Sequence, residues 1–110
     1  MNLNTTIPVN VTPEAAQHVA QLGMQAELER MLQHTLQTVA GLQSIDVVLG
    51  DPYDTGDDPR IVIEAWRDPA LHSPGDPTER ELGFWKVDTF SPDVSRHFTM
   101  LLGPGVSGAG

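Results

Sequence analysis

Cysteine is absent from the 110 residues of this chain. Its absence excludes disulfide bridges, cysteine-ligated zinc, iron–sulfur clusters and thiol catalysis, and it fits a reducing compartment. Basic residues are also scarce, because six lysines and arginines stand against fifteen aspartates and glutamates. Since a surface of this sign repels phosphate groups, we expect no nucleic-acid binding.

Long apolar runs are missing as well. The first ten residues have neither the basic nor the apolar region of a signal peptide, and no run approaches the ~18 apolar residues of a membrane span. We therefore expect a cytoplasmic protein that contacts no membrane. The length suits one compact domain, so we expect a single α+β domain over residues 1–102 and a flexible glycine-rich tail over residues 103–110.

Two helices are predicted in the first part of the chain. Thr12 can cap a helix that begins at Pro13, with Glu14 near the positive end of the helix dipole. The apolar stripe changes direction at Gly23, which is typical of a left-handed residue that ends a helix. A second helix is expected over about residues 24–40, before Gly41.

Alternating apolar residues predict strands in the middle of the chain. Residues 44–50 and 60–66 form a predicted hairpin, and residues 83–90 a third strand with Lys86 and Asp88 on its solvent side. Residues 91–102 carry Ser91 as a cap and apolar residues at helical spacing. The expected fold is thus α+β, with two N-terminal helices, a three-stranded antiparallel sheet and a C-terminal helix.

Residues 50–60 hold four aspartates and invite comparison with a calcium loop. An EF-hand loop that begins at Asp51 would need ligands where this chain has Tyr53, Pro59 and Val62. Aspartate, glycine and proline are explained more simply as turn formers. We expect a turn that binds no metal.

Catalytic patterns are equally sparse. The chain has four histidines, His18, His34, His72 and His97. None has another histidine three or four residues away, so no helical pair could ligate zinc, and no phosphate-binding glycine loop occurs. We therefore assign no catalytic residue, no metal and no cofactor. One weak candidate remains in the long connection over residues 67–82, a pocket lined by His72, Asp76 and Glu79.

A protein-interaction function is suggested by apolar residues on the predicted solvent face of the sheet. These residues are Val48, Val62, Trp66 and Phe84. If the last helix or the long connection does not cover them, they form an interface. The leading hypothesis is a non-enzymatic interaction module that binds a protein partner or self-associates. The alternative is a small-molecule-binding protein or small enzyme that uses the pocket beside residues 67–82.

The order of short segments along the chain resembles that of short, acidic bacterial proteins with no assigned activity. The segments are TPEAA, LG, ML, YDTG, DPTER, WKV and TFSPDV. This resemblance spans most of the chain and implies no functional residues. The opening VTPEAAQHV is similar to the A-type iron–sulfur carriers, but those carriers work through cysteines that this chain lacks.

Overall fold

A computed structural model describes residues 7–50, 60–73 and 76–105, which form an α+β fold. The elements in chain order are β1 (Val9–Val11), α1 (Pro13–Leu22), α2 (Gln25–Thr38), β2 (Leu42–Leu49), β3 (Ile61–Arg67), the 3-10 helix η1 (Pro69–Leu71), α4 (Thr78–Thr89), α5 (Pro92–Ser95) and β4 (Phe98–Pro104). In these residues the four strands form one sheet in the order β1-β2-β3-β4. The sheet is mixed, because β2 and β3 are antiparallel while β1 and β4 run parallel to their neighbours.

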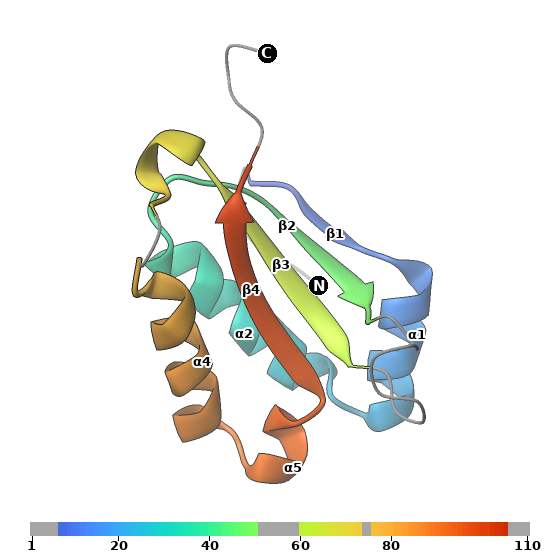
Figure 1. The fold of residues 1–110 in the computed structure, drawn as a ribbon. Helices are drawn as coiled ribbons and strands as arrows, with labels where there is room; N and C mark the ends of the chain where they lie inside the picture. The colour runs from blue at the N-terminus through green and yellow to red at the C-terminus, as the bar shows by residue number, and fades with distance from the viewer. Residues whose placement is uncertain (1–6, 51–59, 74–75, 106–110) are drawn as a thin grey trace.

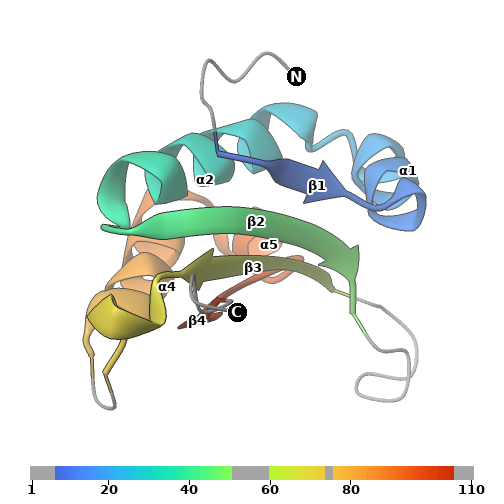
Figure 2. The same ribbon diagram turned by 90° about the horizontal axis from the view of Figure 1, so that it is seen from above.

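The described helices and the sheet form two layers. In Figure 1, α2 passes behind β3 and β4, α1 lies beside the end of β2, and α4 lies beside β4. Seen from above in Figure 2, α1 and α2 lie on one side of β2 and β3. Along β2, β3 and β4, buried residues alternate with residues that are at least partly exposed, so one face of the sheet is covered and the opposite face is open.

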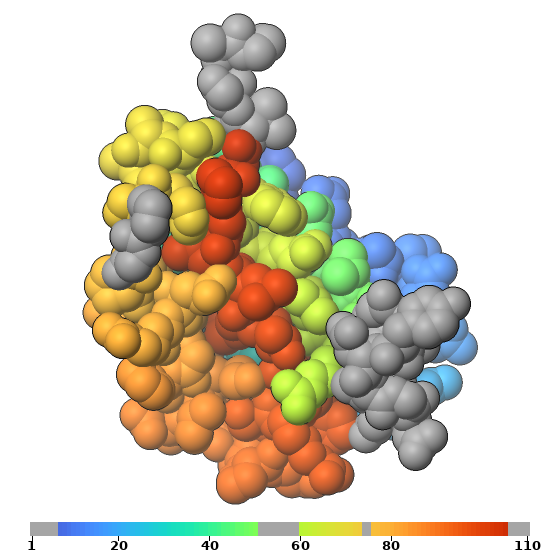
Figure 3. All heavy atoms as spheres, in the orientation of Figure 1, coloured from blue at the N-terminus to red at the C-terminus, as the bar shows by residue number. Residues whose placement is uncertain are grey.

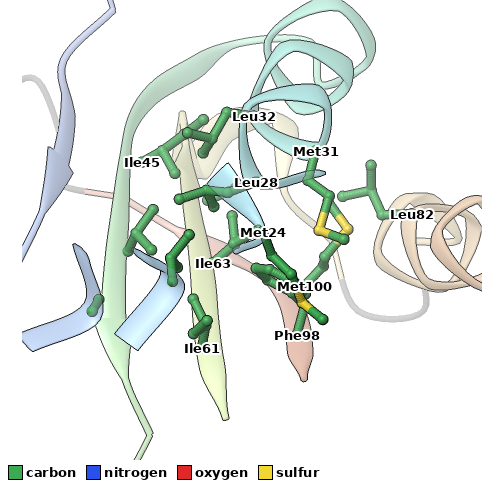
Figure 4. Close-up of a cluster of buried hydrophobic side chains, with 14 of the residues drawn as sticks. Met24, Leu28, Met31, Leu32, Ile45, Ile61, Ile63, Leu82, Phe98 and Met100 are labelled. Atoms are coloured by element: carbon green, nitrogen blue, oxygen red, sulfur yellow. The ribbon is translucent and has the colours of Figure 1, made fainter. Parts of the chain in front are cut away.

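The apolar core lies between the covered face and the helices (Figure 4). Alternate residues of each strand point into it, as the two-residue period of a strand requires. The fully buried strand residues are Ile45, Val47, Ile61, Ile63 and Phe98. α2 contributes Leu28, Met31 and Leu32, and α4 contributes Leu82.

The first two helices confirm the prediction from capping signals. The Thr12 hydroxyl accepts a hydrogen bond from the Ala15 amide at 3.2 Å. Gly23 has a φ of 68° and ends α1, and the Met24 amide donates to the Val19 carbonyl in the pattern of a Schellman cap. The apolar side chains of α2, of which Leu28 is the first buried one, face the sheet.

The predicted third strand was wrong, because residues 83–90 belong to α4 and not to the sheet. Just before α4, Asp76 accepts a hydrogen bond from the Thr78 amide at 2.8 Å. Gly83 has no positive φ, so the helix continues through it.

The predicted C-terminal helix was also wrong beyond its first turn. Ser91 caps α5, and its hydroxyl accepts a hydrogen bond from the Val94 amide at 3.3 Å, but α5 ends at Ser95. The chain then forms β4, in which Phe98, Met100 and Leu102 are buried in alternation. β4 includes Gly103 and Pro104, which the sequence had placed in the tail. β1 was not predicted.

α4 satisfies the backbone along the outer edge of β4. The Lys86 ammonium donates to the carbonyls of Phe98, at 2.6 Å, and Ser95, at 3.2 Å. Seven residues earlier in α4, a carboxylate oxygen of Glu79 accepts from the Leu102 amide at 2.8 Å. Two helical turns, roughly 10.5 Å, nearly match four strand residues, roughly 13 Å. The helix is therefore in register with the edge that it covers.

Two glycine substitutions should change stability in opposite directions. Nothing lies within 4 Å of a Cβ built on either Gly23 or Gly83, so only backbone conformation distinguishes them. Gly83→Ala should raise the free energy of unfolding by about 0.5–1 kcal/mol, because glycine is a poor residue inside a helix. Gly23→Ala should lower it by about 1–2 kcal/mol, because an L-residue is strained in the left-handed region. Urea unfolding measures both, and a stabilising Gly23→Ala would contradict the cap.

Removing the ammonium of Lys86 should destabilise the edge of β4. Lys86→Met keeps the aliphatic stem but leaves the two carbonyls without this donor, and we expect a loss of about 1–2 kcal/mol. Burial, together with the charge of Arg60, lowers the pKa of Lys86, so part of the bond energy is offset by desolvation. Arg80→Met is the matched control, since Arg80 lies exposed on the same helix. Equal melting temperatures for the two variants would rule out the edge contact.

Candidate functional site

The open face of the sheet carries three rows of side chains that point away from the helices. Strand register sets the rows as Val48, Val62 and Thr99, then Asp46, Glu64 and Leu101, then Ser44, Trp66 and Gly103. We call these nine residues the outer face. Glu64 stands at its centre, on β3 in the middle row.

The outer face is exposed among the described residues. Strands β2, β3 and β4 form the visible surface in the middle of Figure 3, with no helix over them. Leu101 is 41% exposed, and Val48, Val62 and Trp66 are partly exposed. The sequence left open whether a C-terminal helix covers this face, but residues 98–104 form β4, a strand of the sheet itself. Val48, Val62 and Trp66 lie on this face as alternation predicts, and their role as an interface stays a prediction.

Phe84 was assigned to the same face, and that placement was wrong. It lies on α4 and is 62% exposed, beside Val87 at 61%. The alternation that placed it beside Trp66 holds only if residues 83–90 are a strand.

The side chain of Trp66 lies along the outer face. Its indole N–H donates to one Asp46 carboxylate oxygen on β2 at 3.0 Å. The far end of the ring lies close to Gly103 on β4, where an added Cβ would be 3.2 Å from ring atom Cζ3. Asn10 on β1 donates to the second Asp46 oxygen at 3.2 Å. Neighbouring strands on both sides thus fix the ring.

Two hollows flank the Trp66 ring. One, of about 380 Å³, is lined by residues that include Gln43, Asp46, Trp66 and Pro104. The other, of about 230 Å³, lies between β3, β4 and α4 and is lined by Glu64, Trp66, Glu79 and Leu101, among others. A side chain at position 103 would crowd the ring, so glycine there leaves room for it.

The acidic side chains of the outer face form no ion pair with a described residue. Among the described residues the ion pairs are Arg67 with Asp76 and Arg96 with Asp93. Glu64 has no hydrogen-bond or ion-pair partner in that part of the chain, and Asp46 bonds only to neutral donors. The middle row therefore presents two carboxylates that no described cation neutralises.

The predicted cluster of His72, Asp76 and Glu79 is not joined by hydrogen bonds or ion pairs. Asp76 contacts Thr78 and the buried Arg67, and donors from these two residues hold the pKa of its carboxyl far below its usual range. Glu79 binds the edge of β4, and Nδ1 of His72 is buried without a partner among the described residues. Asp76 and Glu79 therefore serve separate local contacts, and neither is bonded to His72.

No group of three or more histidine, aspartate or glutamate side chains within residues 7–50, 60–73 and 76–105 could hold a metal ion. No helix in those ranges is long and apolar enough to cross a bilayer. Residues 51–59 lie outside the described part, so the expectation that their aspartates bind no calcium stays a prediction.

Sequence reasoning missed Leu101 and Gly103 as members of the outer face. Both lie in β4, which was interpreted as helix and tail. The available signal was the alternation of Phe98, Thr99 and Met100. It is short, and the apolar residues that follow also fit helical spacing.

The two acidic residues of the middle row should differ in their effect on stability. Asp46→Ala removes the acceptor of the Trp66 indole and of Asn10, and we expect a loss of about 1 kcal/mol. Glu64→Ala removes a side chain with no described partner, and we expect a change within about 0.5 kcal/mol. Urea unfolding compares them, and the Trp66 indole proton resonance should shift only in Asp46→Ala. An equal loss in both variants would contradict the assigned contacts.

No protein-family model, curated protein or solved structure matches this chain in the comparisons made. Any function assigned to the outer face therefore comes from its own geometry and charge.

Proposed function

We propose that the protein is a non-enzymatic interaction module that binds a partner polypeptide on the outer face. The observation that carries the proposal is an open sheet face bearing Val48, Val62, Trp66 and Leu101. Burying apolar surface gains roughly 25 cal/mol per Å², and a tryptophan already held by its hydrogen bond to Asp46 loses little side-chain freedom on binding. This face has the elements of an interface core.

Charge defines the chemistry of the partner. Asp46 and Glu64 lie among the apolar residues, and the chain has a formal net charge of −9. The basic side chains of a partner would neutralise these two carboxylates, and its apolar side chains would cover the apolar residues of the face. Electrostatic complementarity of this kind also raises the rate of association.

A second copy of the chain fits this face less well. A two-fold axis through the middle of the face would bring Glu64 close to its own symmetry mate, because a symmetric interface pairs each central residue with itself. Like charges placed opposite each other are destabilising. We therefore favour a basic partner over the self-association that the sequence left open, and we expect the isolated protein to be monomeric.

The alternative, a small-molecule or enzymatic pocket beside residues 67–82, gains no specific support. Asp76 and Glu79 are engaged separately and neither is bonded to His72, and neither hollow beside Trp66 is lined by His72 or Asp76. The apolar outer face remains the better-supported site.

A displayed library of random peptides tests the proposal. Peptides selected on the wild-type protein should be enriched in basic and apolar residues. Their affinity should fall at least tenfold, about 1.4 kcal/mol, for Trp66→Glu, which replaces the largest apolar side chain of the face by a charge. Isothermal titration calorimetry measures the affinities, and sedimentation velocity should give a monomer.

Phe84→Glu is the matched control, because it makes the same kind of change at an exposed apolar residue on α4. It should leave peptide affinity unchanged. Selected peptides that bind Trp66→Glu as tightly as the wild type would refute the proposed face, and a dimer that dissociates in Trp66→Glu would favour a second copy as the partner.

A further inference from the structure

The Trp66 indole offers a partly exposed aromatic surface to a partner. Its N–H is tied to Asp46 on one neighbouring strand, and its opposite end lies close to Gly103 on the other. The ring is thus held between β2 and β4 and lines both hollows. The negative potential of an indole face attracts cations.

A free carboxylate stands next to this ring. Glu64 is two residues before Trp66 on the same side of β3, roughly 6.6 Å along the strand. The two side chains line the same hollow of about 230 Å³, together with Glu79. One Glu79 oxygen accepts from the Leu102 amide, while Glu64 has no partner among the described residues. The hollow thus combines an aromatic plane with uncompensated negative charge.

We infer that this hollow receives the guanidinium of an arginine side chain from the partner polypeptide, stacked on Trp66 and paired with Glu64. The inference rests on the proposed function and specifies its central contact. A guanidinium is planar and weakly hydrated, so it can stack on an indole while its edge donates two hydrogen bonds to a carboxylate. A lysine ammonium is compact and strongly hydrated, and it can satisfy only one of these contacts well.

Other occupants of an open indole face are less consistent with the charge. A sugar ring would stack on Trp66 but would leave Glu64 uncompensated, and a neutral aromatic ring would bury the carboxylate without a partner. Burial of an unpaired charge is unfavourable. The unpaired acid beside the ring therefore selects a cation.

The experiment uses the full chain and three blocked pentapeptides. The first alternates valine and arginine, the second replaces arginine by lysine, and the third replaces it by citrulline, which keeps the planar shape without the charge. The arginine peptide should shift the indole N–H resonance of Trp66 in heteronuclear NMR titrations. Trp85 is an internal reference, because its ring stacks on His34 at 3.8 Å between α2 and α4.

Two variants test the named contacts. Glu64→Gln keeps the size of the side chain and should weaken binding of the arginine peptide about fivefold. Trp66→Leu removes the aromatic plane and should weaken it at least fivefold. Glu81→Gln removes one negative charge from an exposed position on α4 and should have no effect beyond a small change in long-range attraction. Circular dichroism checks that each variant is folded.

The outcomes separate this inference from the proposed function. Equal binding of the citrulline or lysine peptide, or an unchanged affinity in Glu64→Gln, refutes the guanidinium contact even where selected peptides still bind the outer face. Failure of the arginine peptide to bind, with selected peptides binding normally, refutes it too. If neither the selected peptides nor the pentapeptides bind the outer face, both the proposed function and the guanidinium contact are refuted. Sugars added at the same concentrations should leave the Trp66 resonance unmoved.

Discussion

Seven residues of β4 pair in parallel with β3, from Phe98 beside Ile61 to Pro104 beside Arg67. This pairing determines the arrangement of both layers. Because residues 98–104 complete the sheet as β4, this segment does not lie over the outer face. The same pairing places the edge of β4 beside α4, where Glu79 and Lys86 bond to its backbone. The core and the candidate interface are thus two sides of one set of strand contacts.

Short sequence patterns were sufficient to predict the elements whose ends depend on contacts between residues near each other in the chain. Thr12 and Gly23 delimit the first helix through their own backbone and side-chain bonds, and such caps can be recognised in a sequence. The β2–β3 hairpin also follows from alternation within each strand. By contrast, Phe84, Trp85 and Val87 fit an alternating pattern as well as a helix. Only contacts with distant residues, such as Lys86 with the carbonyl of Phe98, distinguish these alternatives.

The position of residues on the candidate site could be predicted only where the strand that carries them was predicted. Val48, Val62 and Trp66 were placed on the outer face correctly because β2 and β3 were recognised. Phe84 was misplaced because residues 83–90 form a helix. The hydrogen bond between Trp66 and Asp46, and the position of Gly103 close to the ring, join residues 20 and 37 positions apart in the chain. No short pattern encodes such a juxtaposition. It depends on strand register, which the complete sheet sets.

The hydrogen bonds between α4 and the edge of β4 should also lower the tendency of the protein to aggregate. An unprotected strand edge is a template for another chain, and successive addition leads to cross-β fibres. On the β4 side, an incoming strand would have to displace charge-assisted bonds from Glu79 and Lys86. On the other side, β1 offers only three residues. The protein can therefore leave an apolar sheet face uncovered while disfavouring polymerisation through strand addition at its edges.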